Sequence, residues 1–257
     1  MNPFVHLIAD YGKADPALSE VVHRLQSESR AIDVQTTAVR PFSTIATGFW
    51  IEQLGVHNPA FEGLTIYSNT APRAGDSAPR QFNEGEGLCY LELDNGAPVL
   101  AIDGGYKLSF VRDHVREFRA VNAPREGSQF RSRDFFPARV AEIAAGDLNS
   151  LGEELSIDTI PSKPEAAVCH VDGYDNLKTS IRDSGFDPAE ERLTVEIDSR
   201  TRTALHRNAV FEVGEGNLVV APGSAGGEDP YLEIVQRGGS AARLFDEPSP
   251  GATITVR

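Results

Sequence analysis

The hydrophobic pattern changes after residue 164, and this change constrains the fold more than any other feature of the sequence. Before it, short apolar runs at 4–9, 31–39 and 63–69 alternate with segments whose apolar residues recur at helical spacing, as at 18–25 and 45–55. Amphipathic helices produce that spacing, whereas buried parallel strands read as nearly continuous apolar runs. The first part of the chain is therefore predicted to be an α/β domain with a largely parallel sheet.

Local signals mark where these elements start and stop. Asp15 is placed to cap the helix that follows it, and Pro16 suits the first helical turn. Asp94-Asn95-Gly96 predicts a hairpin between strands at 88–93 and 98–102. A further helix is expected over 135–145, and residues 70–87 are expected to form a long irregular loop, which in a compact domain is often functional.

After the linker-like segment 159–164 the chain contains short β runs, Gly-rich turns and no clear helix. The runs are 167–171, 193–197, 209–213, 218–221, 231–235 and 252–256. This pattern is typical of a small β-sandwich or β-barrel. We therefore expect two domains, an α/β domain over 1–160 and a β-barrel domain over 161–257.

Charge and cysteine content exclude several classes of function. The formal net charge is −14 and the pI is near 4.8, so the chain repels both a phosphate backbone and anionic lipid. Nucleic acid and membrane partners are therefore not expected. Cys89 and Cys169 are too few and too far apart for a disulfide framework or a zinc site, and both are expected to be free thiols.

The N-terminal residues have no basic segment and reach Asp10 after a short apolar run, so no signal peptide is expected. No apolar stretch approaches the roughly 20 residues that a membrane-spanning helix needs. A cytoplasmic location is the expectation.

Common catalytic motifs are absent, since the chain has no Walker A loop, no GxSxG elbow and no HExxH. Its six histidines are scattered without metal-ligand spacing, so structural or surface roles are favoured and no metal is expected.

Polar residues at the ends of predicted strands are better candidates, because α/β sheets bind ligands there. Asp10 could accept two hydrogen bonds from a ribose diol, or it could cap a turn, and the sequence does not separate these. Residues 130–134 enter a helix where backbone N–H groups can meet a ligand, although Arg133 could simply pair with Asp134 or another acid. Tyr174 and Asn176 sit in a predicted tight turn between two strands and could be ordinary hairpin residues.

Five segments, in this order along the chain, resemble one family, the S-adenosylmethionine hydroxide adenosyltransferases, with their relatives the fluorinase and chlorinase. Residues 171–181 (VDGYDNLKTSI) give the strongest match, to VDxFGNxxTNI, and residues 130–146 are similar to the FHGRDxFAPVAAxLAxG segment. Residues 231–242 are similar to YLEIAxNxGSAA, and residues 10–12 followed by Asp15 to DFGxxD. Residues 71–75 with Arg80 are a degraded form of DPGVGxxR.

The resemblance implies a homotrimer in which S-adenosylmethionine lies between the N-terminal domain of one subunit and the C-terminal domain of the next. A nucleophile attacks the ribose C5′ and expels methionine, and S-adenosylmethionine is the substrate, with no further cofactor. By family correspondence Asp10 holds the ribose hydroxyls, Phe42 lines the wall near C5′ and Asp15 lies near the methionine end. Phe130 belongs to the substrate-binding segment.

In the C-terminal domain the same correspondence gives four further roles. Tyr174 stacks on adenine, Asn176 bonds to the nucleoside, Asp172 takes the methionine ammonium, and the backbone at Gly238 meets the adenine edge.

The sequence departs from the family at the positions that surround the nucleophile. Water-using members carry an Asp, an Arg and a His around the water, and the matching positions here are Ala71, Arg80 and Arg131. No obvious base remains unless an acid such as Asp76 replaces it. Ser132 stands where the fluorinase has its halide-contacting Ser, so Arg80, Arg131 and Ser132 are the candidate catalytic residues.

The prediction is therefore an S-adenosylmethionine hydrolase that yields adenosine and methionine. Two alternatives stay open, an enzyme that transfers the adenosyl group to a halide, and a protein that binds S-adenosylmethionine or adenosine without catalysis.

Overall fold

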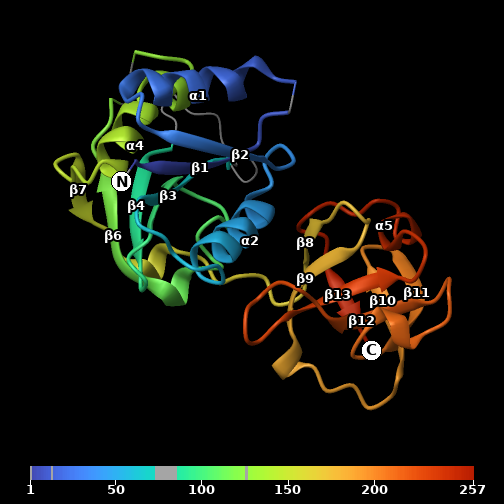
Figure 1. The fold of residues 1–257 in the computed structure, drawn as a ribbon. Helices are drawn as coiled ribbons and strands as arrows, with labels where there is room; N and C mark the ends of the chain where they lie inside the picture. Colours follow the sequence, from blue (N-terminus) through green and yellow to red (C-terminus); the bar gives the residue numbers. More distant parts are fainter. Residues whose placement is uncertain (1, 13, 73–85, 125–126) are drawn as a thin grey trace. The chain divides into compact units, whose positions relative to one another are not determined.

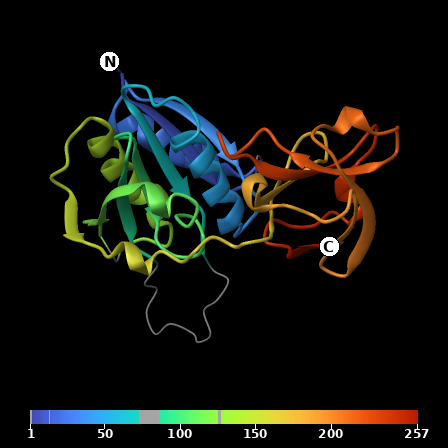
Figure 2. The same cartoon turned by 90° about the horizontal axis from the view of Figure 1, so that it is seen from below.

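The computed structural model describes residues 2–12, 14–72, 86–124 and 127–257. The chain splits into two compact units, Met1–Ser162 and Lys163–Arg257, each with a seven-stranded sheet of its own (Figures 1 and 2). The division falls within the linker-like segment 159–164. The exact boundary at residue 160 stays a prediction.

The N-terminal sheet has the strand order β2-β1-β3-β5-β4-β6-β7. The strands are β1 (Phe4–Ala9), β2 (Asp33–Ala38), β3 (Leu64–Asn69), β4 (Leu88–Leu93), β5 (Pro98–Ile102), β6 (Val115–Val121) and β7 (Leu151–Glu154). Strands β2, β1, β3 and β5 are parallel to one another, as expected. Strands β4, β6 and β7 form an antiparallel part of the sheet. The tight turn at Asp94-Asn95-Gly96, with Gly96 at φ 82°, connects β4 and β5 as a hairpin. Strand β6 then pairs antiparallel with β4, and β7 with β6.

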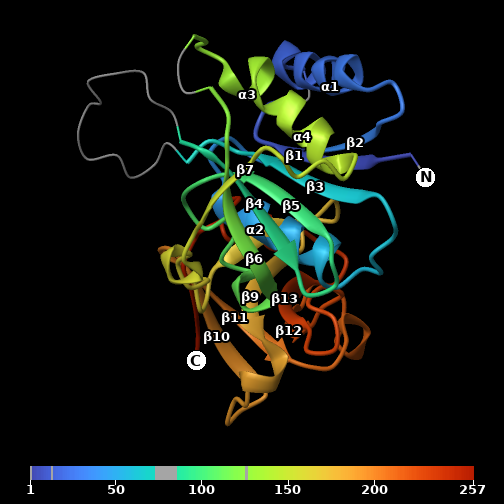
Figure 3. The same cartoon turned by 90° about the vertical axis from the view of Figure 1, so that its left-hand side faces the viewer.

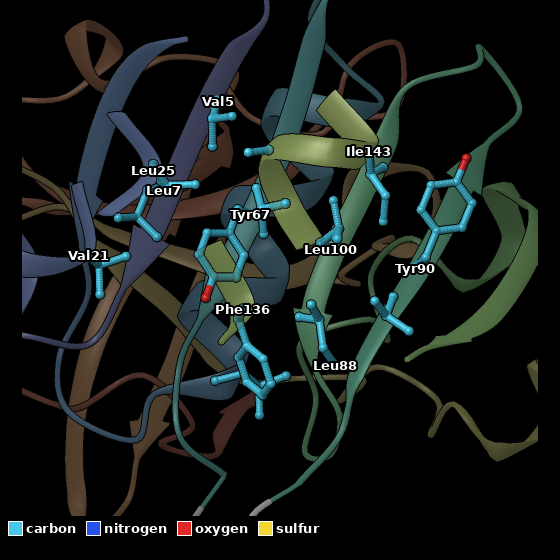
Figure 4. Close-up of a cluster of buried hydrophobic side chains, with 14 of the residues drawn as sticks. Val5, Leu7, Val21, Leu25, Tyr67, Leu88, Tyr90, Leu100, Phe136 and Ile143 are labelled. Atoms are coloured by element: carbon cyan, nitrogen blue, oxygen red, sulfur yellow. The ribbon is translucent and has the colours of Figure 1, made fainter. Parts of the chain in front are cut away.

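Helices cover both faces of this sheet (Figures 1 and 3). One face carries α1 (Pro16–Glu28), α3 (Arg131–Asp134) and α4 (Phe136–Ala144), and the other carries α2 (Thr44–Gly55). Tyr67 of β3 is fully buried in the hydrophobic core between the sheet and the helices α1 and α4. It lies between the side chains of Leu7 and Leu100 and beside Phe136 (Figure 4). Two short 3-10 helices, η1 (Arg112–His114) and η2 (Ile157–Thr159), complete this unit.

The chain order of the parallel strands fixes where a ligand can bind. From β1 the chain passes through α1 to β2 on one side, and β2 then connects through α2 to β3 on the other side of β1. The strand order therefore reverses at β1, and ligands of open α/β sheets bind at the carboxyl ends of the strands beside such a reversal. Asp10 directly follows β1 at this edge.

The C-terminal sheet has the order β14-β10-β11-β12-β13-β9-β8. Its strands are β8 (Val168–Val171), β9 (Leu177–Arg182), β10 (Arg192–Ile197), β11 (Arg200–His206), β12 (Leu218–Pro222), β13 (Tyr231–Gln236) and β14 (Ile254–Val256). The sheet curls until its two edges meet, with a bridge between Ala167 and Thr253 and a hydrogen bond of 3.0 Å from the Ile254 N–H to the Ala166 carbonyl. The fold class, an α/β domain followed by a small β-barrel, is confirmed.

Three local expectations for this unit were wrong. Residues 209–213 do not form a strand but contain the 3-10 helix η4 (Val210–Glu212), whose side chains are mostly exposed. Strand β11 went unpredicted because its Arg and Thr side chains alternate on an exposed surface rather than forming an apolar run. The unit also has two short helices, η3 (Asp183–Gly185) and α5 (Ala241–Leu244), where no clear helix was expected.

Two smaller observations bear on the sequence analysis. Cys89 and Cys169 are both buried, and neither is in a disulfide, as expected. Among the described residues, no helix is long and apolar enough to cross a membrane.

Candidate functional site

The carboxylate of Asp10 organises the ligand-binding edge of the N-terminal sheet. The residue is 8% exposed, and its Oδ2 accepts hydrogen bonds from the backbone N–H of Phe42 at 2.9 Å and of Ala71 at 3.2 Å. Phe42 precedes α2 and Ala71 follows β3, so one oxygen joins the ends of three neighbouring parallel strands. Hydrogen bonds from backbone N–H to a carboxylate are among the stronger kinds in proteins.

Phe42 is held at this edge in an unusual backbone conformation. Its φ is 62°, in the left-handed region that residues other than Gly seldom adopt, and its side chain is 46% exposed. The hydrogen bond to Asp10 requires this conformation to present the N–H inward. The ring is consequently left at the surface, where it can contact a ligand.

Tyr11 is a site residue that the sequence analysis missed. Its hydroxyl interacts with the side chains of Ser132 on α3 and Asn69 at the end of β3, and its ring packs edge-on against Phe130 with centroids 5.7 Å apart. Burial raises the pKa of Tyr11 well above its ordinary value, so the hydroxyl stays protonated at neutral pH. Phe130 and Ser132, two predicted site residues, thus lie with Tyr11 near Asp10.

Asn69 adds a buried donor at the same edge. The residue is 2% exposed, and apart from its interaction with the Tyr11 hydroxyl its Nδ2 makes no hydrogen bond to the described residues. An unsatisfied buried amide costs about 1–3 kcal/mol, so such a group is commonly completed by a ligand or an ordered water. Its position as the last residue of an apolar strand is the signal that could have identified it.

The arginines of segment 130–134 have different surroundings. Arg131 donates from Nε to the Pro124 carbonyl at 3.1 Å and from Nη1 to the Glu86 carbonyl at 3.1 Å. Arg133 pairs with Asp134 at 2.7 Å and with Glu20 at 3.1 Å, which confirms the alternative interpretation of that residue. This pairing lowers the pKa of Asp134 to about 2.

The remaining residues considered from the sequence are Asp15, Arg80 and Asp76. Asp15 is the N-cap of α1, where its side chain accepts from the Ala17 N–H at 2.9 Å. This contact does not test its suggested position near methionine. Arg80 and Asp76 lie outside the described residues.

In the C-terminal unit, the turn between β8 and β9 presents an aromatic ring to solvent. Asp172 Oδ1 accepts from the backbone N–H of Tyr174 at 2.9 Å and of Asn176 at 3.0 Å, and Oδ2 accepts from Asn176 Nδ2 at 3.2 Å. These hydrogen bonds to Asp172 fix the turn, and the Tyr174 side chain on it is 83% exposed. A large exposed ring on a well-fixed turn is suited to stacking on a planar ligand.

A second turn lies against this one. The Ala242 N–H, at the start of α5, donates to the Asp175 carbonyl at 3.0 Å, which joins the segment after β13 to the Tyr174 turn. Gly238 lies in this segment with φ 71°, a conformation that favours Gly. The structure thus brings together Asp172, Tyr174 and Asn176 with the segment that contains Gly238.

Partly buried charges contact Asp172, the residue that fixes the turn. Lys178 Nζ contacts Glu233 Oε1 at 2.5 Å and lies 3.8 Å from Asp172 Oδ2. Burial and the nearby Lys178 lower the pKa of His170, so this imidazole is neutral at pH 7. The arrangement fixes the Asp172 carboxylate between its turn and a cation.

Two further observations concern ligand sites elsewhere. Across the described residues, no group of His, Cys, Asp and Glu is arranged to hold a metal ion. A cavity of about 640 Å³ in the C-terminal unit lies beside Phe186, Arg192 and Arg257, and it contains none of the predicted site residues.

The fold is shared with solved structures. An uncharacterized conserved protein from Thermotoga maritima has a TM-score of 0.77 at 18% sequence identity, over 98% of this chain and 100% of that chain. A conserved hypothetical protein from Thermus thermophilus has a TM-score of 0.70 at 21% identity, over 100% of this chain and 100% of that chain. No curated protein matches the chain significantly.

These structures share with this chain a two-domain fold, in which an α/β domain precedes a small β-barrel. Residues 166–249 match the family model of the SAM hydroxide adenosyltransferase C-terminal domain. This match lies within the C-terminal unit, and it confirms the resemblance to the S-adenosylmethionine hydroxide adenosyltransferases that was found in the sequence.

Proposed function

We propose that this protein hydrolyses S-adenosylmethionine to adenosine and methionine. The observation that carries the proposal is the family match over 166–249, because this range contains Asp172, Tyr174, Asn176 and Gly238, which lie on two adjoining turns. The exposed Tyr174 ring stacks on adenine, and the amide of Asn176 bonds to the nucleoside.

The residues of the N-terminal edge hold the reacting end of the substrate. Asp10 accepts hydrogen bonds from the ribose hydroxyls while the Phe42 and Ala71 amides fix its carboxylate. The Phe42 ring covers the wall near C5′. Tyr11, Asn69 and Ser132 supply neutral polar groups at the same edge, and these can orient a water molecule.

The reaction balances without an acid to activate the leaving group. A water oxygen forms a bond to C5′ as the bond between C5′ and sulfur breaks, and the bonding pair returns to sulfur. Methionine leaves as a neutral thioether, and the water loses a proton to solvent or to a nearby base. Alignment and desolvation of the nucleophile are therefore the main contributions of the protein.

A second candidate is transfer of the adenosyl group to a halide. Ser132 favours it, because its hydroxyl can donate to an anion. Arg131 donates from Nε and Nη1 to the Pro124 and Glu86 carbonyls, which leaves fewer of its N–H groups for an anion. Ala71 and Arg131 stand at the positions where water-using members of the family have an Asp and a His. Their presence supports the third possibility, a protein that binds S-adenosylmethionine or adenosine without turnover.

The residues named here belong to two compact units, and a homotrimer would unite the N-terminal unit of one subunit with the C-terminal unit of the next. This assembly, a cytoplasmic location and the absence of a further cofactor are parts of the proposal. Sedimentation or size-exclusion measurement gives a trimer if it is correct, and a strict monomer contradicts the shared site.

The deciding experiment is incubation of the purified protein with S-adenosylmethionine, with and without chloride or fluoride at constant ionic strength, followed by chromatography. Adenosine and methionine in equal amounts, at a rate independent of halide, are the expected products. A 5′-haloadenosine would establish halide transfer instead. No product together with thermal stabilisation by adenosine would identify a binding protein.

Asp10 gives the sharpest mutational test. Asp10→Ala removes the acceptor for the ribose hydroxyls and for two buried amides, so we expect loss of turnover and about 2 kcal/mol lower stability. Asp10→Asn retains one oxygen for the amides and should lose less stability while still losing roughly tenfold or more in affinity for adenosine. Calorimetric titration and urea unfolding measure both effects, and wild-type turnover in Asp10→Ala would contradict the site.

A further inference from the structure

Lys107 is a fully buried lysine that the proposed reaction does not use. It lies on the loop between β5 and η1, is 0% exposed, and donates from Nζ to the Thr70 carbonyl at 3.1 Å. Lysine is almost never buried without a specific partner, because its charge is costly to remove from water. The position of this amine therefore calls for a function.

The partner of Lys107 belongs to a buried hydroxyl network. Thr47 Oγ1 donates to the Ser43 carbonyl at 3.0 Å and lies 2.8 Å from Thr70 Oγ1. Because a threonine hydroxyl has one proton, the Thr70 hydroxyl must donate to Thr47. Thr47 and Thr70 are both fully buried, so this network joins the first turn of α2 to the end of β3 without contact with solvent.

The network ends next to both amides that bind Asp10. Ser43 directly follows Phe42, and Thr70 directly precedes Ala71. The N–H groups of Phe42 and Ala71 are the donors to Asp10 Oδ2. Lys107 therefore fixes the peptide that presents one of these donors, the Ala71 N–H. The two threonines connect it to the Ser43 carbonyl, which lies two peptide units after the Phe42 N–H.

Close backbone packing delivers the lysine to this position. A Cβ on Gly48 of α2 would lie 2.5 Å from the Tyr106 carbonyl oxygen, so only Gly allows the loop to approach the helix there. Gly105 has φ 67°, and a Cβ on it would lie 2.6 Å from Thr44. The loop is thus seated on α2 immediately before Lys107.

Titratable groups from several elements face the amine. They are the thiol of Cys89 on β4, whose pKa burial raises to about 12 so that it is neutral near pH 8, and the carboxylates of Asp103 after β5, Glu86 before β4 and Asp10 after β1, which oppose the effect of burial. Burial is the largest effect and lowers the pKa of Lys107 to about 8. The amine therefore changes charge just above neutral pH.

We propose that Lys107 is a positioning residue for ligand binding, which acts through the Thr70 carbonyl to hold the Ala71 and Phe42 amides against the Asp10 carboxylate. The inference rests on the proposed function, because it assigns Asp10 to the ribose. A protonated amine makes a charge-assisted hydrogen bond to Thr70, and such bonds are roughly twice as strong as neutral ones. Binding should accordingly weaken when Lys107 loses its proton.

The test compares wild type with Lys107→Met, Lys107→Arg and the control Arg112→Gln. Arg112 of η1 makes an exposed ion pair with Asp158 of η2 at 3.2 Å and also donates to Ser162, so its loss removes a cation without touching the network. The first readout needs no ligand and is the hydrogen-exchange protection of the Phe42 and Ala71 amides. We expect protection to fall about fivefold or more in Lys107→Met and to be unchanged in Arg112→Gln.

The second readout is the affinity for adenosine between pH 6.5 and 9.5. The affinity of wild type for adenosine should fall about fivefold as pH rises through 8. Lys107→Met should bind adenosine weakly and Lys107→Arg with nearly the affinity of wild type, and neither variant should show this step in affinity near pH 8. A step that remains in Lys107→Met would overturn the inference. The wild-type profile itself needs no variant, so a poorly folding Lys107→Met leaves this readout in place.

The two readouts separate failure of the inference from failure of the proposed function. Unchanged protection of both amides in Lys107→Met overturns the role of Lys107, whatever the protein binds. Lost protection in a protein that has no affinity for adenosine at any pH refutes the ribose assignment, while the positioning of Asp10 by Lys107 stands.

Discussion

At the scale of single residues, the two groups of candidate site residues, one in each unit, use carboxylates in the same way. Asp10 and Asp172 each accept two backbone N–H groups, and each thereby shapes the segment that carries an exposed aromatic ring, Phe42 in one unit and Tyr174 in the other. The ring is left at the surface because the backbone beneath it is fixed. Substitution of a ring should consequently affect binding and leave folding intact.

Tyr174 provides that test. Tyr174→Ala should weaken adenosine binding by about 1–3 kcal/mol, the range for aromatic stacking on a base, while Tyr174→Phe keeps the stacking surface and nearly the wild-type affinity. Because the side chain is 83% exposed, thermal unfolding of both variants should match wild type. Equal affinity of all three proteins in a calorimetric titration would remove Tyr174 from the site.

The buried amine of Lys107 has a separate consequence for stability. Its pKa is lowered from 10.5 to about 8, so between these values the unfolded chain binds more protons than the folded one. The contribution of Lys107 to the free energy of unfolding therefore rises as pH increases from about 8 to 10.5. Urea unfolding should show the stability of wild type relative to Lys107→Met increasing from pH 8 to 10.5, and a constant difference would mean that the amine is not desolvated.

At the scale of elements, apolar pattern and cap residues predicted most of the strands and helices, whereas charged strands escaped prediction. Strand β6 carries Arg and Glu between its apolar residues, and β11 carries alternating Arg and Thr, so neither forms an apolar run. The site was predictable only in part. Asp10 follows a strand in the sequence, but the contacts of Tyr11 with Ser132 and of Lys107 with Thr70 join distant segments, and no local pattern encodes them.

The cap of α1 allows the two interpretations of Asp15 to be separated. Asp15→Ala should lower stability by about 1 kcal/mol through loss of the bond from the Ala17 N–H, and Asp15→Ser should retain most of it. Chemical denaturation measures this effect. If Asp15→Ser is stable but binds S-adenosylmethionine more weakly than wild type, with adenosine affinity unchanged, the residue also serves the methionine end.

At the scale of the whole molecule, each unit has a hydrophobic core of its own. The C-terminal core includes Val168, Val195, Leu232 and Ile254, drawn from strands around the barrel. A unit with a separate core can fold alone. The chain can therefore be tested in two parts.

We expect the fragment 163–257 to fold independently and to retain the Tyr174 turn. Circular dichroism should show a β-rich spectrum with a cooperative thermal transition, and a Leu232→Ala variant of the fragment should unfold more readily by about 2–5 kcal/mol, because it creates a cavity in this core. A fragment without a cooperative transition would mean that the C-terminal unit depends on the rest of the chain.

The bridge between Ala167 and Thr253 places the first and last strands of the barrel beside each other. The order of strands around the barrel is thus nearly independent of where the chain begins. A circular permutant could join residue 257 to residue 163 by a short linker and open the chain at an exposed turn such as 214–216. The strand pairings would be kept, and the permutant should therefore retain the β-rich spectrum and the cooperative transition of the fragment 163–257.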